Sequence, residues 1–193
     1  MNMEFFRLIN NLAGQNSVLD KIMVFFSKDV PYIFMAVIAI VFILGVAQKN
    51  ADYRKIAVST FVFTAINLLL SFIIGGIYFE NRPFVNNKVN LLYSHVEDAS
   101  FPSDHATGTM SIALGFGKYN KLLSLILTAM SVIVGVSRVY VGHHYPMDII
   151  GAYIMVWVTS YIYNLKLRSK VESLYEVIEN ILVVRLGLKK MYN

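Results

Sequence analysis

The stretch Ile56–Phe79, IAVSTFVFTAINLLLSFIIGGIYF, decides the fold of this chain. It contains no Asp, Glu, Lys or Arg. A helix needs about 20 predominantly apolar residues to cross the roughly 30 Å hydrocarbon core of a bilayer. Four further stretches lack these charged residues and approach that length: Pro31–Gln48, Ala106–Gly117, Leu122–Ser137 and Ile149–Leu165. The sequence therefore predicts an all-α, polytopic membrane helix bundle with about five spans.

One of these stretches, Ala106–Gly117, is too short to span by itself. A helix that starts at Ser103 gains a further turn, and it keeps polar and small side chains such as Thr109, Ser111 and Gly108. Such side chains favour close packing between membrane helices. We therefore expect this helix to lie inside the bundle.

The composition agrees with a membrane protein and excludes several other classes. Hydrophobic residues make up 56% of the chain and charged residues 15%, against about 25% charged in an ordinary soluble domain. The chain has no cysteine, which excludes a disulfide-stapled secreted domain and a cysteine-ligated metal site. The net charge is +5, but in a membrane protein the location of the charges matters more than their sum. We predict no nucleic-acid partner.

Both ends of the chain differ from the apolar centre. Met3–Leu12 and Ser17–Phe26 are too short to span a bilayer, and we expect both to be interfacial helices. Lys170–Leu186 has a similar amphipathic pattern. If Ser17–Phe26 dips through the membrane with its neighbour, the core has six helices. We expect one domain over residues 1–193, divided into interfacial helices (1–28), a transmembrane core (29–165) and a cytoplasmic amphipathic tail (166–193).

The charges sort by side of the membrane. Loop 49–55, loop 118–121 and the chain after Leu165 share one side, and together they hold 11 of the 17 Lys and Arg residues. Because basic residues favour the cytoplasmic side, these segments are predicted to face the cytoplasm. Segments 80–105 and 137–148 then lie together on the outer face.

The two outer segments carry the ionisable residues that could form a site. They contain His95, His105, His143 and His144, with Arg82 and Arg138 at the ends of apolar runs. Ionisable residues at membrane depth are costly and indicate a functional site by default. The alternative for a single arginine is that its side chain only reaches out to the interface.

The segment Phe101–His105, FPSDH, has the features of a helix start. Proline ends the preceding loop, and serine and aspartate favour the first positions of a helix. The free amides and the dipole at that end favour an anion. His105 would stand beside such an anion. The alternative is an ordinary capped helix with a nearby histidine.

The segment from Ser137 to Asp148 supplies a second pattern. His144 and Asp148 are four residues apart, around Pro146 at the predicted start of the last span. Asp148 can therefore accept a hydrogen bond from one ring nitrogen of His144, leaving the other nitrogen free as a nucleophile or base. The alternative makes Asp148 a first-turn acid that complements the helix dipole.

With Arg82-Pro83, these segments resemble the signature of the type 2 phosphatidic-acid phosphatase superfamily of membrane lipid phosphatases. That family shows an Arg-Pro segment, a Pro-Ser-Gly-His segment and a Ser-Arg…His…Asp segment. The longer strings YFENRPF (78–84), DASFPSDH (98–105) and GHHYPMD (142–148) look like the branch of bacterial undecaprenyl-diphosphate phosphatases linked to bacitracin resistance.

The resemblance implies roles for the site residues. His144, held by Asp148, would attack phosphorus and form a phosphohistidine, and His105 would protonate the leaving oxygen and later activate water. The predicted phosphate-binding residues are Arg82, Ser103, Asp104, Arg138 and Ser137. No carboxylate cluster on the outer face offers octahedral ligands, so we expect neither a metal nor another cofactor.

Two positions depart from the family pattern. The family lysine seven residues before the arginine is Gly75 here, and Lys88 is the candidate that could replace its phosphate contact. Asp104 replaces the family glycine, as in the bacitracin-resistance branch, and it suits a phosphate site only if its side chain turns away. Glu80 has no role that the sequence explains.

Outward placement at a bacterial plasma membrane favours a polyprenyl diphosphate lipid as substrate, with the chain of the lipid remaining in the bilayer. A broader lipid phosphatase acting on phosphatidylglycerophosphate or phosphatidate is the first alternative. A small transporter is the second, although the ionisable residues cluster at one end of the spans rather than through their middles.

Overall fold

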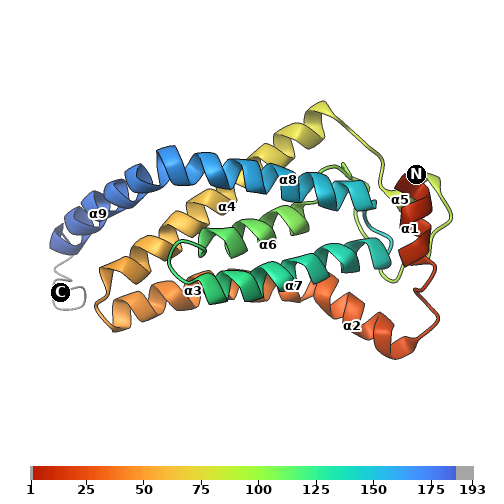
Figure 1. Cartoon of the computed structure of the whole chain (residues 1–193), viewed down its shortest axis with the longest axis horizontal. Coiled ribbons are helices and arrows are strands. Elements are labelled where there is room, and N and C mark those ends of the chain that lie inside the picture. Colours follow the sequence, from red (N-terminus) through yellow and green to blue (C-terminus); the bar gives the residue numbers. More distant parts are fainter. Residues whose placement is uncertain (1, 186–193) are drawn as a thin grey trace.

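A computed structural model describes residues 2–185 of the chain, without the side chain of Val184. The described part is an elongated bundle of helices (Figure 1). The helices are α1 (Asn2–Asn10), α2 (Ser17–Lys28), α3 (Val30–Ala47), α4 (Ala51–Ile77), α5 (Pro83–Asn86), α6 (Asp104–Gly115), α7 (Lys121–Tyr140), α8 (Pro146–Ile162) and α9 (Arg168–Arg185), with a π-helical segment at Tyr163–Leu167. The expected all-α fold is confirmed. The last part of the predicted tail, 186–193, lies outside the described residues.

Asparagine side chains begin three of the helices. The side-chain oxygen of Asn16 accepts from the amides of Val18 and Leu19 at the start of α2. Asn50 and Asn120 act in the same way at the starts of α4 and α7. Each cap satisfies amides that would otherwise lack a partner at a helix start. These contacts fix where the apolar helices begin.

Three of the five predicted spans are long and apolar enough to cross a membrane: α3, α4 and α7. Helix α8 has 17 residues and α6 has 12. At 1.5 Å per residue, α6 is about 18 Å long, shorter than the bilayer core. It packs against α3, α4, α7 and α8, so other helices surround it. Its expected place inside the bundle is confirmed.

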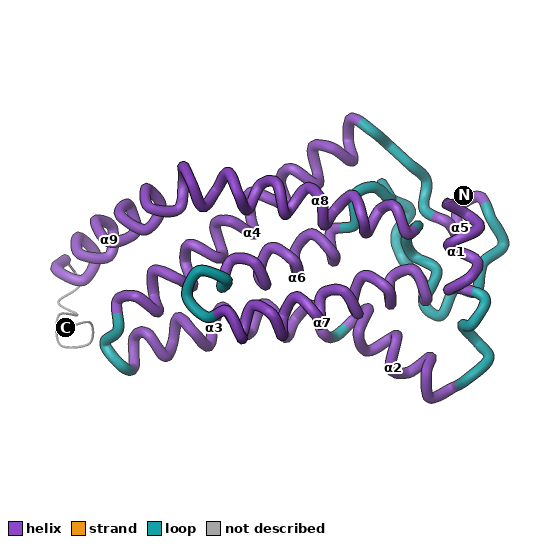
Figure 2. The backbone as a smooth tube through the Cα atoms, viewed as in Figure 1, coloured by secondary structure: helices purple, strands orange, loops and turns teal. Residues whose placement is uncertain are grey.

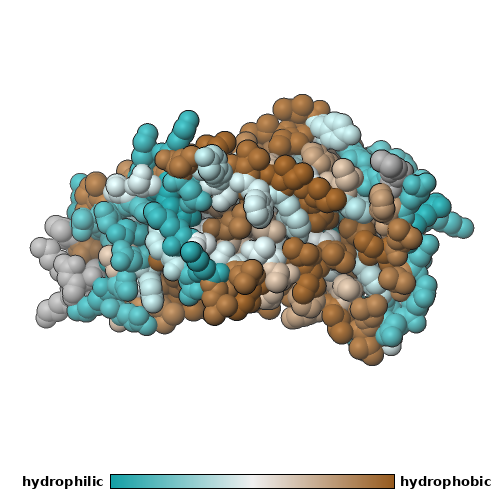
Figure 3. Space-filling view, in the orientation of Figure 1, coloured by the Kyte–Doolittle hydropathy of each residue, from teal (hydrophilic) through white to brown (hydrophobic). Residues whose placement is uncertain are grey.

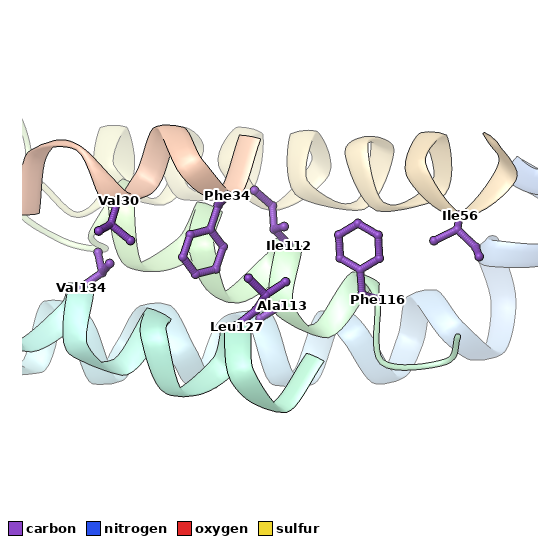
Figure 4. Packing of buried hydrophobic residues seen from close by; sticks show 8 residues of the cluster. All are labelled: Val30, Phe34, Ile56, Ile112, Ala113, Phe116, Leu127 and Val134. Atoms are coloured by element: carbon purple, nitrogen blue, oxygen red, sulfur yellow. The ribbon is translucent and has the colours of Figure 1, made fainter. Parts of the chain in front are cut away.

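The centre of the bundle is packed with apolar side chains. Buried residues of α3, α4, α6 and α7 meet there (Figure 4), namely Val30, Phe34, Ile56, Ile112, Ala113, Phe116, Leu127 and Val134. Because α6 and α7 carry His105 and Arg138 at one end, this packing fixes the relative positions of those two residues.

The molecule has two polar ends with an apolar region between them (Figure 3). One end holds the α3–α4 turn, the α6–α7 turn and α9, and the other holds α1, α2, α5 and the long loops (Figure 2). The segments predicted to be cytoplasmic therefore gather at the first end. The predicted outer segments gather at the second.

Helix α9 is attached to α4 through its acidic side chains. Glu179 pairs with Arg54, with its Oε1 at 2.6 Å from Nε, and Glu176 pairs with Lys55 at 2.8 Å. The apolar residues of α9 that were predicted to share one face are largely exposed, including Leu174, Ile178, Ile181 and Leu182. This arrangement suits the predicted amphipathic tail at a membrane surface.

Candidate active site

The fold brings the three predicted segments together at one end of the bundle. Arg82 follows α4, His105 lies in the first turn of α6, and Arg138 lies in the last turn of α7. His144 is in the α7–α8 loop, and Asp148 is in the first turn of α8. The site is therefore built where four helices begin or end, and their buried packing holds its side chains.

His144 is buried, and its two ring nitrogens have different partners. Nε2 lies 2.8 Å from Nη1 of Arg82. A guanidinium can only donate a hydrogen bond, so Nε2 accepts and carries no proton. Nδ1 carries the proton and faces the carbonyl oxygen of Ser100 at 2.9 Å and Oδ2 of Asp148 at 3.3 Å. This tautomer leaves a lone pair on Nε2, as a nucleophile requires.

Asp148 has hydrogen-bond partners in addition to His144. Its Oδ2 accepts from the hydroxyl of Ser100 at 2.5 Å and from the amide of Tyr145 at 2.8 Å. Ser100 therefore holds both the histidine, through its carbonyl, and the aspartate, through its hydroxyl. Sequence reasoning missed Ser100 although it lies in the string DASFPSDH (98–105), because the superfamily pattern begins at Pro102 and a loop serine carries no periodic or spacing signal.

The environment of His144 favours its neutral form. Burial, and then the positive charge of Arg82, lower the pKa of His144 well below its ordinary value. A neutral imidazole with an unprotonated Nε2 is the nucleophilic form. Nε2 of His144 is therefore unprotonated at neutral pH, as a nucleophilic role would require.

Arg82 is buried and held by two residues besides His144. Its Nε donates to Asp98 at 2.6 Å, and its Nη1 donates to the carbonyl of His143 at 3.2 Å. Asp98 was not predicted as a site residue. It orients the guanidinium so that Nη1 faces the histidine.

Arg138 is held along one edge only. Its Nη1 donates to the hydroxyl oxygens of Tyr93 at 2.9 Å and Ser27 at 3.1 Å. Its Nε and Nη2 are buried and have no hydrogen-bond partner among the described residues. A buried, unsatisfied guanidinium edge is costly unless a ligand completes it. A phosphate group offers oxygens in the geometry that this edge can bind.

Three of the predicted phosphate-binding residues are not arginines, and their side chains have different hydrogen-bond partners. Ser103 precedes α6, and its buried hydroxyl has no partner among the described residues, so it remains available to a phosphate. The hydroxyl of Ser137 donates to the carbonyl of Val134 in its own helix at 2.6 Å. Asp104 is exposed and accepts from the hydroxyl of Ser71 on α4 at 2.6 Å. Its side chain is therefore directed toward α4, while its amide lies at the start of α6.

The half-buried His105 lines a cavity of about 230 Å³ together with Asp104, Tyr32, Leu68, Gly108 and other residues of α3, α4 and α6. The cavity gives the imidazole access to a molecule that enters between the helices. This is the position that an acid and base for a lipid substrate needs.

Gly75 shows why the family lysine has no counterpart in this chain. A side chain at Gly75 would lie 3.2 Å from Cβ of Ala99 and 3.3 Å from the carbonyl oxygen of Phe101. The loop before α6 therefore occupies the space that a lysine would need. Lys88, the candidate to replace the family lysine, is exposed on a loop.

We expect Gly75→Lys to destabilise the protein by about 1–3 kcal/mol without raising its activity, because the longer side chain meets the packed loop. Thermal unfolding in detergent and phosphate release would measure both effects. Gly76→Lys is the matched control, since nothing lies within 4 Å of a Cβ at Gly76. Equal stability of the two variants would contradict this explanation.

Glu80 has a structural role through its backbone. Its carbonyl accepts from the amide of Ser100 at 2.8 Å, beside a bridge between Asn81 and Ala99. Burial raises the pKa of its half-buried carboxyl group. Glu80 thus fixes the backbone of Ser100, which in turn holds the histidine and aspartate.

The amino-terminal helix α1 also supports the site. Nδ2 of Asn10 donates to the carbonyls of Asn90 and Tyr140, both at 2.8 Å, and its Oδ1 accepts from the amide of Asn90. Gly142, with φ of +93°, begins the loop that carries His144 and packs against Asn90. Asn10 therefore ties this loop to the loop before α6, a role that a predicted interfacial helix did not suggest.

Comparisons with known proteins show the family and the fold of this chain. The model of the PAP2 superfamily matches residues 56–170. The chain is 34% identical over 163 residues to undecaprenyl-diphosphatase BcrC of Bacillus subtilis (strain 168), covering 84% of this chain and 82% of that protein. It is 31% identical over 189 residues to the bacitracin transport permease protein BcrC of Bacillus licheniformis, covering 95% and 91%. The crystal structure of Aquifex aeolicus LpxE has the same fold, with a TM-score of 0.70 at 24% identity over 83% of this chain and 93% of that chain.

Proposed function

This chain belongs to the PAP2 superfamily, and we propose that it is an undecaprenyl-diphosphatase, which removes the terminal phosphate of undecaprenyl diphosphate to leave undecaprenyl phosphate. The observation that carries the proposal is the tautomer of His144. Its Nδ1 is held by Ser100 and Asp148, and its unprotonated Nε2 accepts a hydrogen bond from Arg82. A terminal phosphate that replaces this hydrogen bond would meet a nucleophile on one side and a cation on the other.

In the first step, Nε2 of His144 attacks the terminal phosphorus. A P–N bond forms as the bond from phosphorus to the bridging oxygen breaks, giving a phosphohistidine and undecaprenyl phosphate. Arg82 and the unpartnered edge of Arg138 stabilise charge on the equatorial oxygens. His105 donates a proton to the leaving oxygen, which is itself a phosphate oxygen and needs less help from an acid than an alkoxide.

In the second step, water attacks the phosphohistidine. His105, now neutral, takes a proton from the water as the P–N bond breaks, and inorganic phosphate leaves. Asp148 stabilises the imidazole of His144 while it carries the phosphoryl group. The same two histidines thus serve both steps, and the cycle consumes one water.

A second cavity supports a lipid substrate. About 580 Å³ in volume, it lies between α3 and α4 and is lined by apolar side chains such as Ile38, Phe42 and Phe61. It shares Met35, Thr64, Leu68 and Ile112 with the cavity beside His105. A polyprenyl chain could therefore lie between these helices while its diphosphate reaches the site.

We place the enzyme in a bacterial plasma membrane, as one domain with its site at the outer face. There it would regenerate the lipid carrier of cell-wall synthesis. We also propose that this activity gives resistance to bacitracin, as the resemblance to the bacitracin-resistance branch implies.

Phosphate release by the purified protein in detergent tests the activity. We expect release from undecaprenyl diphosphate in the presence of EDTA, at a higher kcat/KM than from phosphatidylglycerophosphate. The reverse preference would assign a broader lipid phosphatase. Release from neither lipid would reject the enzyme and favour transport, and loss of activity in EDTA would reject the metal-independent mechanism.

The orientation can be tested by labelling, because the chain has no cysteine of its own. Lys88 follows α5 and Lys118 lies in the α6–α7 turn, and both are exposed. The loop after α5 and the α6–α7 turn lie at opposite ends of the bundle (Figure 1). We expect Lys88→Cys to react with a membrane-impermeant maleimide in intact cells. The matched variant Lys118→Cys should react only after the membrane is opened, and the opposite pattern would place the site inside.

A further inference from the structure

The two phosphate-binding arginines come from distant parts of the chain and have no direct contact. Arg82 lies after α4 and Arg138 lies at the end of α7, and both are buried. To bind one phosphoryl group together, their guanidinium groups must keep a fixed separation and orientation. Neither the family motifs nor the helix packing alone specifies how this is achieved.

Tyr93 and His143 form a continuous connection between the two arginines. The carbonyl of His143 accepts from Nη1 of Arg82 at 3.2 Å, and Nε2 of His143 lies 2.9 Å from the carbonyl oxygen of Tyr93. The rings of Tyr93 and His143 pack edge to face, with centroids 4.3 Å apart. The hydroxyl of Tyr93 then accepts from Nη1 of Arg138 at 2.9 Å.

The hydroxyl of Tyr93 is itself held in place. It lies 2.7 Å from the hydroxyl of Ser27, which in turn lies 3.1 Å from Nη1 of Arg138. These three groups form a closed triangle in which Nη1 of Arg138 is fully used. Only Nε and Nη2 remain for a ligand, and both are buried without a partner among the described residues. The Tyr93 hydroxyl therefore decides which edge of Arg138 faces the substrate.

His143 is suited to this position because it stays neutral. A carbonyl oxygen can only accept a hydrogen bond. Nε2 of His143 therefore carries the ring proton and donates a hydrogen bond to the carbonyl oxygen of Tyr93. Burial, and then the charge of Arg138, lower the pKa of His143 to about 3. The imidazole therefore adds no third positive charge between the two guanidinium groups at neutral pH.

We propose that Tyr93 and His143 are positioning residues that set the separation and orientation of Arg82 and Arg138 for one phosphoryl group. This inference rests on the proposed function in that the bound group is taken to be a phosphate. Tyr93 lies outside the three motif segments, and His143 lies within the third one, at a position to which the family pattern assigns no role. Both act through the arginines rather than by touching the reacting atoms.

The test uses the full chain in detergent and measures the affinity for orthovanadate, a mimic of the phosphoryl group in transfer. We expect Tyr93→Phe to weaken vanadate binding, and to lower kcat, by about tenfold or more, as for the loss of a hydrogen bond to a charged group. Tyr175→Phe is the matched control, since it removes a tyrosine hydroxyl bonded to Glu179 at the other end of the bundle. The control should keep wild-type vanadate affinity.

A double-mutant cycle separates positioning from a general loss of stability. If Tyr93 acts through Arg138, then Tyr93→Phe should have little further effect on vanadate affinity once Arg138 is replaced by lysine. For His143, the glutamine variant keeps a donor toward Tyr93 and should retain more affinity than His143→Leu. Additive effects of Tyr93→Phe and Arg138→Lys, or unchanged vanadate affinity in Tyr93→Phe, would overturn the inference.

The same experiment distinguishes failure of this inference from failure of the proposed function. Vanadate binding is measured without turnover of a lipid. If the wild-type protein binds vanadate but hydrolyses no undecaprenyl diphosphate, the proposed substrate fails while the variants still test the positioning role. If the wild-type protein does not bind vanadate at all, the positioning inference itself is overturned.

Discussion

Replacing His144 with alanine is expected to lower the rate of phosphate release by on the order of 10⁴-fold or more, as for loss of a catalytic nucleophile. The reason is that Nε2 of His144 is unprotonated and lies beside Arg82, the arginine that we propose binds the phosphate. The variant should also fail to form a phosphoenzyme. Rapid quenching with labelled substrate, followed by a search for an acid-labile and alkali-stable phosphoprotein, measures this directly.

His105→Gln, compared with His144→Ala, separates the first step of the reaction from the second. The leaving group is a phosphate and needs little protonation, so the first step should continue while the attack of water slows. The phosphohistidine should therefore accumulate in His105→Gln and be absent in His144→Ala. A phosphoenzyme in His144→Ala, or residual activity close to the wild type, would contradict the assignment of the nucleophile.

The sequence predicted the long apolar helices because length and lack of charge are local properties. The ends of α3, α4 and α7 fall within a few residues of the predicted spans, and asparagine caps account for the starts of α4 and α7. The motifs also indicated His144 and Asp148, since residues four apart meet across one helical turn. Spacing alone made this contact possible but left the role of Asp148 open, and the family resemblance supplied the roles of both residues.

The partners of the motif residues could not be predicted in this way. Ser100, Asp98 and Tyr93 lie on irregular loops, where the direction of a side chain depends on backbone turns that have no periodic pattern. Ser27 approaches Arg138 only because α2 packs against α7. Contacts of this kind arise from tertiary packing between segments that are distant in sequence.

Ser137 shows that a residue in a family motif does not always direct its side chain toward the site. The family pattern places a serine before Arg138, and the sequence alone offers its hydroxyl to the phosphate. In the structure, that hydroxyl donates to the carbonyl of Val134, three residues earlier in α7. Serine in a helix commonly makes such a local bond. A direct role of Ser137 in phosphate binding remains a prediction, and it requires this bond to break.

Arg138→Lys is expected to lower kcat/KM by about 10²–10³-fold although the positive charge is kept, comparable to removing a preorganised donor from a transition-state site. The guanidinium uses Nη1 for Tyr93 and Ser27, and its Nε and Nη2 have no hydrogen-bond partner among the described residues, so we expect them to bind the phosphate. A lysine has one nitrogen, which cannot hold the protein partners and bind two phosphate oxygens at once. The loss should therefore appear in catalysis more than in folding.

Arg168→Lys supplies a matched control for this prediction. Arg168 is also buried, with Nη2 donating to the carbonyl of Gly115 and with Nε and Nη1 unpartnered among the described residues, but it lies at the opposite end of the bundle. We expect Arg168→Lys to lower the midpoint of thermal unfolding without changing kcat/KM, whereas Arg138→Lys should change kcat/KM and vanadate affinity together. If both variants lose activity in proportion to their loss of stability, then Arg138 acts on folding alone and the unpartnered edge of its guanidinium is not the phosphate site.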